Sequence, residues 1–103
     1  MVKLTILYGH PADPAEFERY YAQEHLPFAQ KLGGVERFEL HRVQRTLDGS
    51  PSPYYRIAEM WYRDAATLRE TWESEDVRAV LADLDHFATG GATLLVAEEA
   101  MPA

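Results

Sequence analysis

The segment that most limits how this chain can fold is residues 54–62, with the sequence YYRIAEMWY. It is short and rich in aromatic and branched side chains, which predicts a β-strand. Because side chains alternate along a strand, Ala58 and Met60 lie on one face, and Ile57 and Trp61 lie on the other. Neither face is polar, so both faces of the sheet that contains this strand must be at least partly covered.

The rest of the chain supplies helices for one of those faces. Hydrophobic spacing and turn residues predict three further strands, at 2–8, 35–45 and 92–97. They predict two helical regions, at 14–32 and 65–87. The helix starts have capping residues, namely Asp13, Asp64 and, for a restart within the second region, Ser74. The order predicts an α+β fold of the ferredoxin-like βαββαβ type, a four-stranded antiparallel sheet with both helices on one face.

The second face of the sheet stays uncovered in a single copy. We expect this face to carry Tyr55, Ile57 and Trp61, or else their counterparts on the opposite side of the strand, and such a patch is unusual on the surface of a monomer. Face-to-face pairing of two sheets buries it, so we expect a homodimer in which the sheets form a shared barrel. A length of 103 residues suits one core, and we expect 1–103 to form a single domain.

The first helix contains a proline where its apolar pattern should continue. Its apolar and aromatic residues recur at helical spacing: Phe17, Tyr21, Phe28 and Leu32. Pro27 interrupts that stripe and cannot donate a hydrogen bond to the carbonyl of Gln23. The sequence therefore predicts a kinked or loosened backbone near residues 23–27. His25 lies beside this turn, at the edge of the buried face.

His25 is the candidate for chemistry. Imidazole exchanges protons near neutral pH, and burial or a nearby carboxylate tunes it in either direction. In the alternative interpretation, His25 is structural and hydrogen-bonds the Gln23 carbonyl that Pro27 leaves free, or another backbone group. The residues alone leave both interpretations open.

Six further residues are candidates for a binding site around His25: Tyr21, Phe28, His41, Glu59, Trp61 and Phe87. Tyr21 offers a hydroxyl that could orient a ligand oxygen, and the other aromatic residues could form walls, although core packing explains them equally well. His41 could pair with His25 if its face of the strand is the helix-covered one. Glu59 could reach either the pocket or the dimer interface. It needs a partner from another element or from the other subunit, because Arg56 points to the opposite face of the same strand.

Charge and composition limit which kinds of macromolecule, metal or cofactor the chain is expected to bind. The formal net charge is −7 and the basic residues are dispersed, which argues against binding to nucleic acid or to a membrane surface. The chain has no cysteine, so disulfides and thiolate ligands are excluded. No histidine pair has metal-ligand spacing and no glycine-rich nucleotide loop follows a strand, so we expect neither a metal nor a bound cofactor. The N-terminal sequence VKLTILYGH shows no basic leader, and we expect a cytoplasmic protein.

Four segments together resemble the EthD family of the dimeric α+β barrel superfamily: YYAQEHLPFAQKL, GGVERFELHRV, PYYRIAEMWY and HFATGGATLLVAEE. The resemblance covers essentially the whole chain. It implies a homodimer with a small-molecule pocket between helices and sheet, and the family histidine maps onto His25. Members are linked to catabolism of ethers and lactones and to tailoring of aromatic polyketides, and many are labelled oxidoreductases. Fold alone does not fix the reaction in so broad a superfamily.

Two functional hypotheses follow. In the first, the protein binds a small aromatic, ether or lactone compound and is a cofactor-independent enzyme of oxidoreductase or isomerase type, or an oxygenase accessory. His25 is then the general acid/base, assisted by Tyr21, His41 and Glu59. In the second, the protein is a non-catalytic ligand-binding or stabilising module, and His25 is structural.

Overall fold

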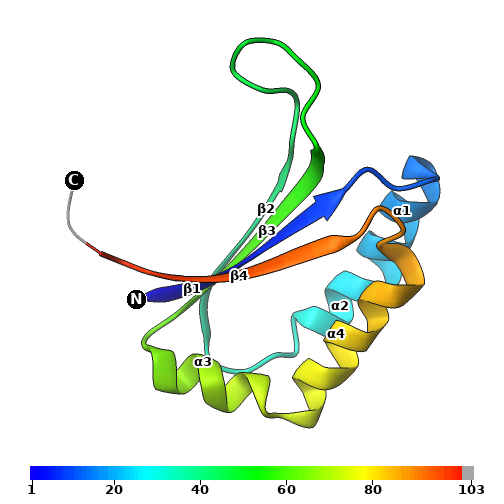
Figure 1. Cartoon of the computed structure of the whole chain (residues 1–103). Coiled ribbons are helices and arrows are strands. Elements are labelled where there is room, and N and C mark those ends of the chain that lie inside the picture. The colour runs from blue at the N-terminus through cyan, green and yellow to red at the C-terminus, as the bar shows by residue number, and fades with distance from the viewer. Residues whose placement is uncertain (101–103) are drawn as a thin grey trace.

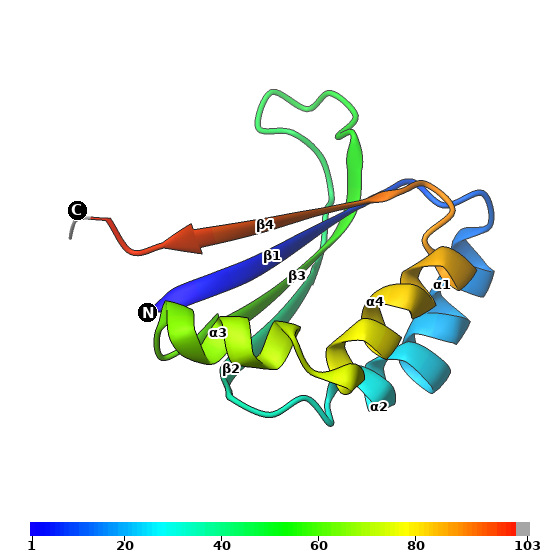
Figure 2. The same ribbon diagram turned by 60° about the horizontal axis from the view of Figure 1, so that its bottom comes forward.

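Four antiparallel strands form one sheet in the computed structural model, which describes residues 1–100 (Figure 1). The strands are β1 (Val2–Gly9), β2 (Val35–Arg42), β3 (Tyr54–Tyr62) and β4 (Ala92–Glu98), in the order β2-β3-β1-β4 across the sheet. The helical segments are α1 (Pro14–Tyr20), the π-helix η1 (Tyr21–His25), α2 (Leu26–Ala29), α3 (Ala65–Trp72) and α4 (Glu75–Phe87). Figures 1 and 2 show them all on one face of the sheet. The predicted ferredoxin-like fold is confirmed.

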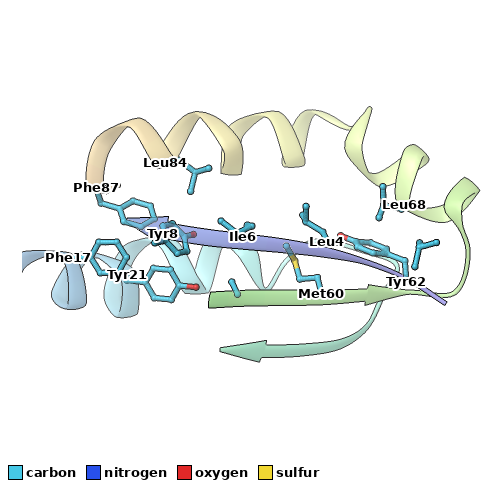
Figure 3. Packing of buried hydrophobic residues seen from close by; sticks show 12 residues of the cluster. Leu4, Ile6, Tyr8, Phe17, Tyr21, Met60, Tyr62, Leu68, Leu84 and Phe87 are labelled. Carbon is cyan, nitrogen blue, oxygen red and sulfur yellow. The ribbon is translucent and has the colours of Figure 1, made fainter. Parts of the chain in front are cut away.

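The core lies between the sheet and this helical layer. Alternate residues of β1 and β3 face the helices and are buried: Val2, Leu4, Ile6, Tyr8, Ala58, Met60 and Tyr62. Residues of the helices complete the cluster, as Figure 3 shows: Phe17, Tyr21, Leu68, Leu84 and Phe87. The alternation expected for β3 is therefore correct from Ile57 onward, and Ile57, Glu59 and Trp61 lie on the open face of the sheet. Tyr55, expected on that face, instead packs against Phe17 of α1, with ring centroids 5.2 Å apart, so its placement is corrected.

Helices α1, α3 and α4 each begin at a polar residue that caps them. The side chains of Asp13, Asp64 and Ser74 each accept a hydrogen bond from the backbone N–H three residues later. Pro14 occupies the first helical position, where its missing N–H leaves no bond unmade. The predicted helix starts are thus confirmed.

The first helical region widens immediately before Pro27. In η1 the N–H of Leu26 donates to the carbonyl of Tyr21, five residues back instead of four. Pro27 has no N–H to continue the ladder, and the wide turn absorbs the mismatch. The predicted loosening is therefore confirmed, and it includes His25.

The same region ends earlier than its apolar stripe indicates. A helix was expected as far as Leu32, but α2 ends at Ala29. The N–H of Gln30 still donates to the carbonyl of Leu26, four residues back, but those of Lys31 and Leu32 donate to carbonyls only three residues back. Gly34 then turns the chain into β2 with a φ of 79°, a conformation that favours glycine.

Two glycines let the end of β1 touch the loop before β4. A Cβ atom on Gly9 would lie 2.2 Å from the carbonyl oxygen of Gly90, and one on Gly90 would lie 2.2 Å from the carbonyl oxygen of His10. Only glycine permits so close an approach. The contact fixes the end of α4, which carries Phe87, beside the end of β1, which carries Tyr8.

The open face of the sheet mixes apolar and charged side chains. The half-buried ring of Trp61 lies between two cations, with Nζ of Lys3 at 5.5 Å and Cζ of Arg37 at 5.0 Å from its centroid. Lys3 also donates to Oε2 of Glu59 at 2.7 Å. The partner of Glu59 therefore comes from β1 of the same chain.

The edge strand β4 exposes two apolar side chains near its C-terminal end. Leu95 and Val96, which point to opposite faces, are 49% and 55% exposed. No helix within residues 1–100 has the length and apolar character to cross a membrane.

Candidate functional site

Aromatic side chains fill one end of the core (Figure 3). The rings of Phe17 and Tyr21 stack with centroids 5.6 Å apart, and Tyr8 meets them edge-on at 5.5 and 5.8 Å. Phe87 lies 5.2 Å from Phe17. These rings form dry surroundings in which electrostatic interactions are strengthened.

His25 closes this aromatic cluster from η1. The residue is 3% exposed, and its ring lies 4.6 Å from Phe87 and 5.5 Å from Tyr21. Burial disfavours the charged imidazolium and lowers the pKa of His25, although the carboxylate of Asp83 acts in the opposite direction. The imidazole is therefore neutral at pH 7.

Asp83 of α4 is the hydrogen-bond partner of His25. Its Oδ2 lies 2.9 Å from Nδ1 of His25, and its Oδ1 accepts from the Tyr20 hydroxyl at 2.6 Å. Partial burial acts to raise the pKa of Asp83, but the hydrogen bonds from Tyr20 and His25 outweigh it, and the pKa is lowered. An ionised carboxylate thus joins α4 to both α1 and η1.

This carboxylate fixes the proton on the imidazole ring. Ionised Asp83 can only accept, so Nδ1 of His25 must carry the proton, and Nε2 of the neutral ring keeps a lone pair. Nε2 makes no hydrogen bond to any of residues 1–100, so the described part of the chain leaves its lone pair free. A carboxylate that orients a histidine in this way prepares its other nitrogen to take a proton.

A second polar group also packs against Tyr21. The Arg56 guanidinium covers the Tyr21 ring, with Cζ 4.6 Å from the centroid, and donates to Glu18 of α1. Glu18 also accepts from the Tyr55 hydroxyl at 2.6 Å. Tyr55 has no partner on β1, because the register shifts between Tyr8 and Gly9. The shift re-aims a side chain, as such irregularities commonly do near functional sites.

Two polar atoms in this region have no partner among residues 1–100: the hydroxyl of Tyr8 and Nε of Arg56. Burial raises the pKa of Tyr8, and the charge and hydroxyl group of the neighbouring Tyr21 raise it further, although the Tyr8 hydroxyl makes no hydrogen bond of good geometry. Burial raises the pKa of Tyr21 to about 12, against the influence of Arg56. An unpartnered buried group destabilises by about 1–3 kcal/mol, so it calls for an explanation.

Two hollows border the helical layer near this site. One of about 570 Å³ lies between α2 and β2, and its walls mix apolar residues such as Leu32 and Phe38 with polar ones such as Glu36 and Arg37. Another of about 110 Å³ lies outside Tyr20 and Phe87. His25 lines neither of them. Across residues 1–100, no group of three or more His, Asp or Glu residues is arranged to hold a metal ion.

The EthD domain model matches residues 9–91, which is most of the chain. The chain belongs to the EthD family. It is 35% identical, over 96% of its length and 95% of the relative's, to an uncharacterised 11.0 kDa protein encoded in the thcB-thcC intergenic region of Rhodococcus erythropolis. The crystal structure of an ethyl tert-butyl ether D (EthD) family protein from Bacillus halodurans matches with a TM-score of 0.89 and 31% identity, over 97% of this chain and 99% of that one.

A more distant match shows the fold alone. SnoaB from Streptomyces nogalater, a cofactor-independent oxygenase, gives a TM-score of 0.58 at 22% identity, over 99% of this chain and 96% of that one. The ferredoxin-like architecture therefore extends beyond the EthD family, without carrying a reaction with it.

Two of the residues predicted from the sequence lie next to His25 in this EthD protein. Tyr21 and Phe87 contact its ring. Phe28 follows on α2 and is half-buried. Their part in a binding site stays a prediction.

The other three predicted residues lie on the open face of the sheet. His41 pairs across the strands with Ile57, and its Nε2 lies 3.0 Å from Oε1 of Glu39. The condition for a His25–His41 pair is therefore not met, because β2 presents His41 away from the helices. Glu59 and Trp61 share that face. The prediction that His41 or Glu59 of the same subunit assists His25 is therefore wrong.

Neither Asp83 nor Arg56 stands out from the sequence pattern. The available signal for Asp83 is its place on the helix, four residues before Phe87 and three after Val80, at the edge of the buried stripe of α4. For Arg56 it is alternation in β3, which places a charge on the same face as Ala58. Contact with residues of α1 and η1 becomes visible only in the fold.

Proposed function

We propose that this EthD protein binds a compact organic molecule and transfers protons to and from it through His25, without a bound cofactor. The observation that supports this most is the hydrogen bond between Nδ1 of His25 and Asp83. Neutral His25 offers Nε2 as a base, and the carboxylate of Asp83 stabilises the imidazolium that forms. Asp83 is a positioning residue, since it acts through His25.

The names of the relatives suggest a substrate class. The family is named for ethyl tert-butyl ether, and SnoaB is described as a cofactor-independent oxygenase. We therefore propose small aromatic, ether or lactone compounds, met in catabolism or tailoring, as substrates. Removal of a proton from an acidic C–H or O–H group is a step that isomerase and oxygenase chemistry can share, so the proposed class is an isomerase, an oxidoreductase or an oxygenase accessory.

The proposal includes a homodimer formed by the open sheet faces. Pairing would remove Ile57 and Trp61 from water, and burial of apolar area drives association. The ion pair between Lys3 and Glu59, at 2.7 Å, already neutralises two of the charges that such a contact would desolvate.

A non-catalytic binding or stabilising module is the second candidate, and one observation favours it. Asp83 links α1, η1 and α4 through Tyr20 and His25. In that role the imidazole would be a structural clamp, and its proton would never reach a ligand.

The variant His25→Gln separates the two candidates. Ligands are first found by thermal shift among phenols, ketones and lactones, since a ligand that prefers the native state raises the melting midpoint. Turnover of each hit is then followed by mass spectrometry. We expect His25→Gln to lose turnover and keep binding, whereas His86→Gln, an exposed histidine on α4, keeps both. Full turnover in His25→Gln with a lower melting midpoint would favour the structural clamp.

A further inference from the structure

Tyr8 and Arg56 present two hydrogen-bond donors that the described part of the fold does not use. The Tyr8 hydroxyl and Nε of Arg56 are buried without a partner among residues 1–100. The two residues are paired across β1 and β3, so their side chains rise side by side on the helix-covered face. Native structures rarely leave two such groups unsatisfied in adjacent positions without a reason.

Tyr21 connects these donors with His25. Its ring lies 5.8 Å from the Tyr8 ring, 4.6 Å from Cζ of Arg56 and 5.5 Å from the His25 ring. Figure 3 shows the hydroxyls of Tyr8 and Tyr21 both pointing toward the middle of the core. The two donors and the proposed base therefore surround one aromatic side chain.

The charge around Arg56 indicates which kind of oxygen suits these donors. Glu18 neutralises the guanidinium, so the free Nε–H is a donor without net positive charge beside it. A strongly hydrated anion, such as a carboxylate, would gain little there against its loss of hydration. An oxygen that becomes negative only during a reaction fits better, because preoriented donors in a dry site stabilise developing charge.

We propose that Tyr8 and Arg56 form an oxyanion-binding subsite, and that the substrate of His25 is a ketone or lactone with an acidic C–H beside its carbonyl group. This inference rests on the proposed function of His25. Since Tyr8 and Arg56 are enclosed and the Tyr21 ring packs against both of them and against His25, the proposal requires the substrate to displace Tyr21. Tyr21 begins the wide turn η1, where the helical ladder is already weakened.

The step balances without an oxidant or cofactor. Nε2 of His25 takes the proton next to the carbonyl group, the C–H electron pair forms a C=C bond, and the carbonyl π pair moves onto oxygen. The resulting enolate accepts hydrogen bonds from the Tyr8 hydroxyl and from Nε–H of Arg56. Return of the proton from His25 to a different carbon of a conjugated enolate gives an isomer, and return to the same carbon restores the substrate.

The chain offers a matched pair of variants, Tyr8→Phe and Tyr62→Phe. The hydroxyl of Tyr62 is also buried and unpartnered, but Figure 3 shows Tyr62 at the other end of the core, near Leu68. Each substitution removes one unsatisfied hydroxyl from a core phenol, so neither should lower stability. Only Tyr8→Phe removes a donor of the subsite.

The test measures loss of deuterium from the carbon beside the carbonyl group of indanone and of dihydrocoumarin by NMR, with unfolding in urea recorded for every variant. We expect the wild-type protein to accelerate the exchange. Removal of one oxyanion donor in Tyr8→Phe should slow it by about 10²–10³-fold through kcat. Tyr62→Phe should change it by less than about two-fold.

The outcomes separate the subsite from the proposed function. If His25→Gln loses exchange while Tyr8→Phe matches Tyr62→Phe, the subsite is overturned and the role of His25 stands. If the wild-type protein does not accelerate exchange, the proposed function fails for these substrates, and a titration with nitrophenol, an enolate mimic, decides the subsite. A shift of the Arg56 Nε–H resonance that Tyr8→Phe abolishes supports it, and the absence of a shift overturns it.

Discussion

Nδ1 of His25 lies 2.9 Å from Oδ2 of Asp83, although 58 positions separate the two residues in the chain. A buried imidazole on η1 is thereby held by a carboxylate of α4. The hydrogen bond determines which nitrogen of His25 is free, and it also joins two elements of the helical layer.

Substitution Asp83→Asn should change both properties. The amide is neutral, so the imidazolium loses its stabilising carboxylate and the pKa of His25 should fall further. We also expect the free energy of unfolding to drop by about 1–3 kcal/mol, because charge-assisted hydrogen bonds from Tyr20 and His25 are lost. NMR titration of the His25 ring and denaturation in urea measure the two effects. Asp85→Asn, an exposed neighbour on α4, is the control, and equal behaviour of the two variants would contradict the assignment.

Stability should decline on mild acidification because of His25. Burial lowers its pKa in the folded state, so below the unfolded value of about 6.5 the unfolded chain binds the extra proton more readily. The contribution is fully present above that pH and is lost as the pH falls toward the lower folded value. The carboxyl of Asp83, whose pKa is also lowered, adds a similar loss that begins only near pH 4 (about its unfolded value) and continues below it. Unfolding in urea between pH 5 and pH 8 (a window of roughly that width around the imidazole value) should show the first slope in the wild type and a weaker one in His25→Gln.

Pro27→Ala should convert the wide turn to an ordinary one. Alanine supplies the N–H that can donate to the Gln23 carbonyl, and the hydrogen bond of the Leu26 N–H should move from Tyr21 to Ala22. A return from five-residue to four-residue hydrogen-bond spacing rotates the side chains before Pro27 by about 100° around the helix axis. This rotation would break the contact between His25 and Asp83. A crystal structure of the variant checks this directly. Pro14→Ala, at the start of α1, should leave η1 unchanged, and persistence of the π-turn in Pro27→Ala would show that the proline is not its cause.

The variant Trp61→Glu should separate the proposed dimer without unfolding the protomer. Trp61 lies on the open face, outside the core, and a carboxylate there would be desolvated by a paired sheet. Leu47→Glu makes a comparable change at a loop residue that is 98% exposed. Sedimentation should give a monomer for Trp61→Glu and a dimer for Leu47→Glu. A monomeric wild type would remove the dimer from the proposal.

Local chemistry explains which parts of the fold could be predicted. Asp13, Asp64 and Ser74 act on their own helix starts, and Pro27 acts on its own turn, so these features follow from short stretches of sequence. Alternation fixed the two faces of β3 for the same reason. The stop of α2 at Ala29 and the end of β2 at Arg42, against an expected Arg45, depend on how the chain turns next, which periodicity does not encode.

The full site could not be predicted, because it depends on contacts between segments that lie far apart in the sequence. His25 was recognised because it lies beside Pro27, but its partner Asp83 comes from a helix whose rotation depends on packing. His41 could not be assigned to a face, because simple alternation puts Phe38 and Leu40 on one side and Val35 on the other, and the register shift that moves Val35 to the side of Phe38 is not visible in the sequence. Tyr8 and Arg56 look unremarkable in sequence, and only the register of β1 against β3 makes them neighbours.

Leu95 and Val96 expose apolar side chains on opposite faces of the edge strand β4. A flat neighbour could shield one of these side chains, never both. A partner that removes both side chains from water must therefore wrap around the edge of the sheet and contact both faces of β4.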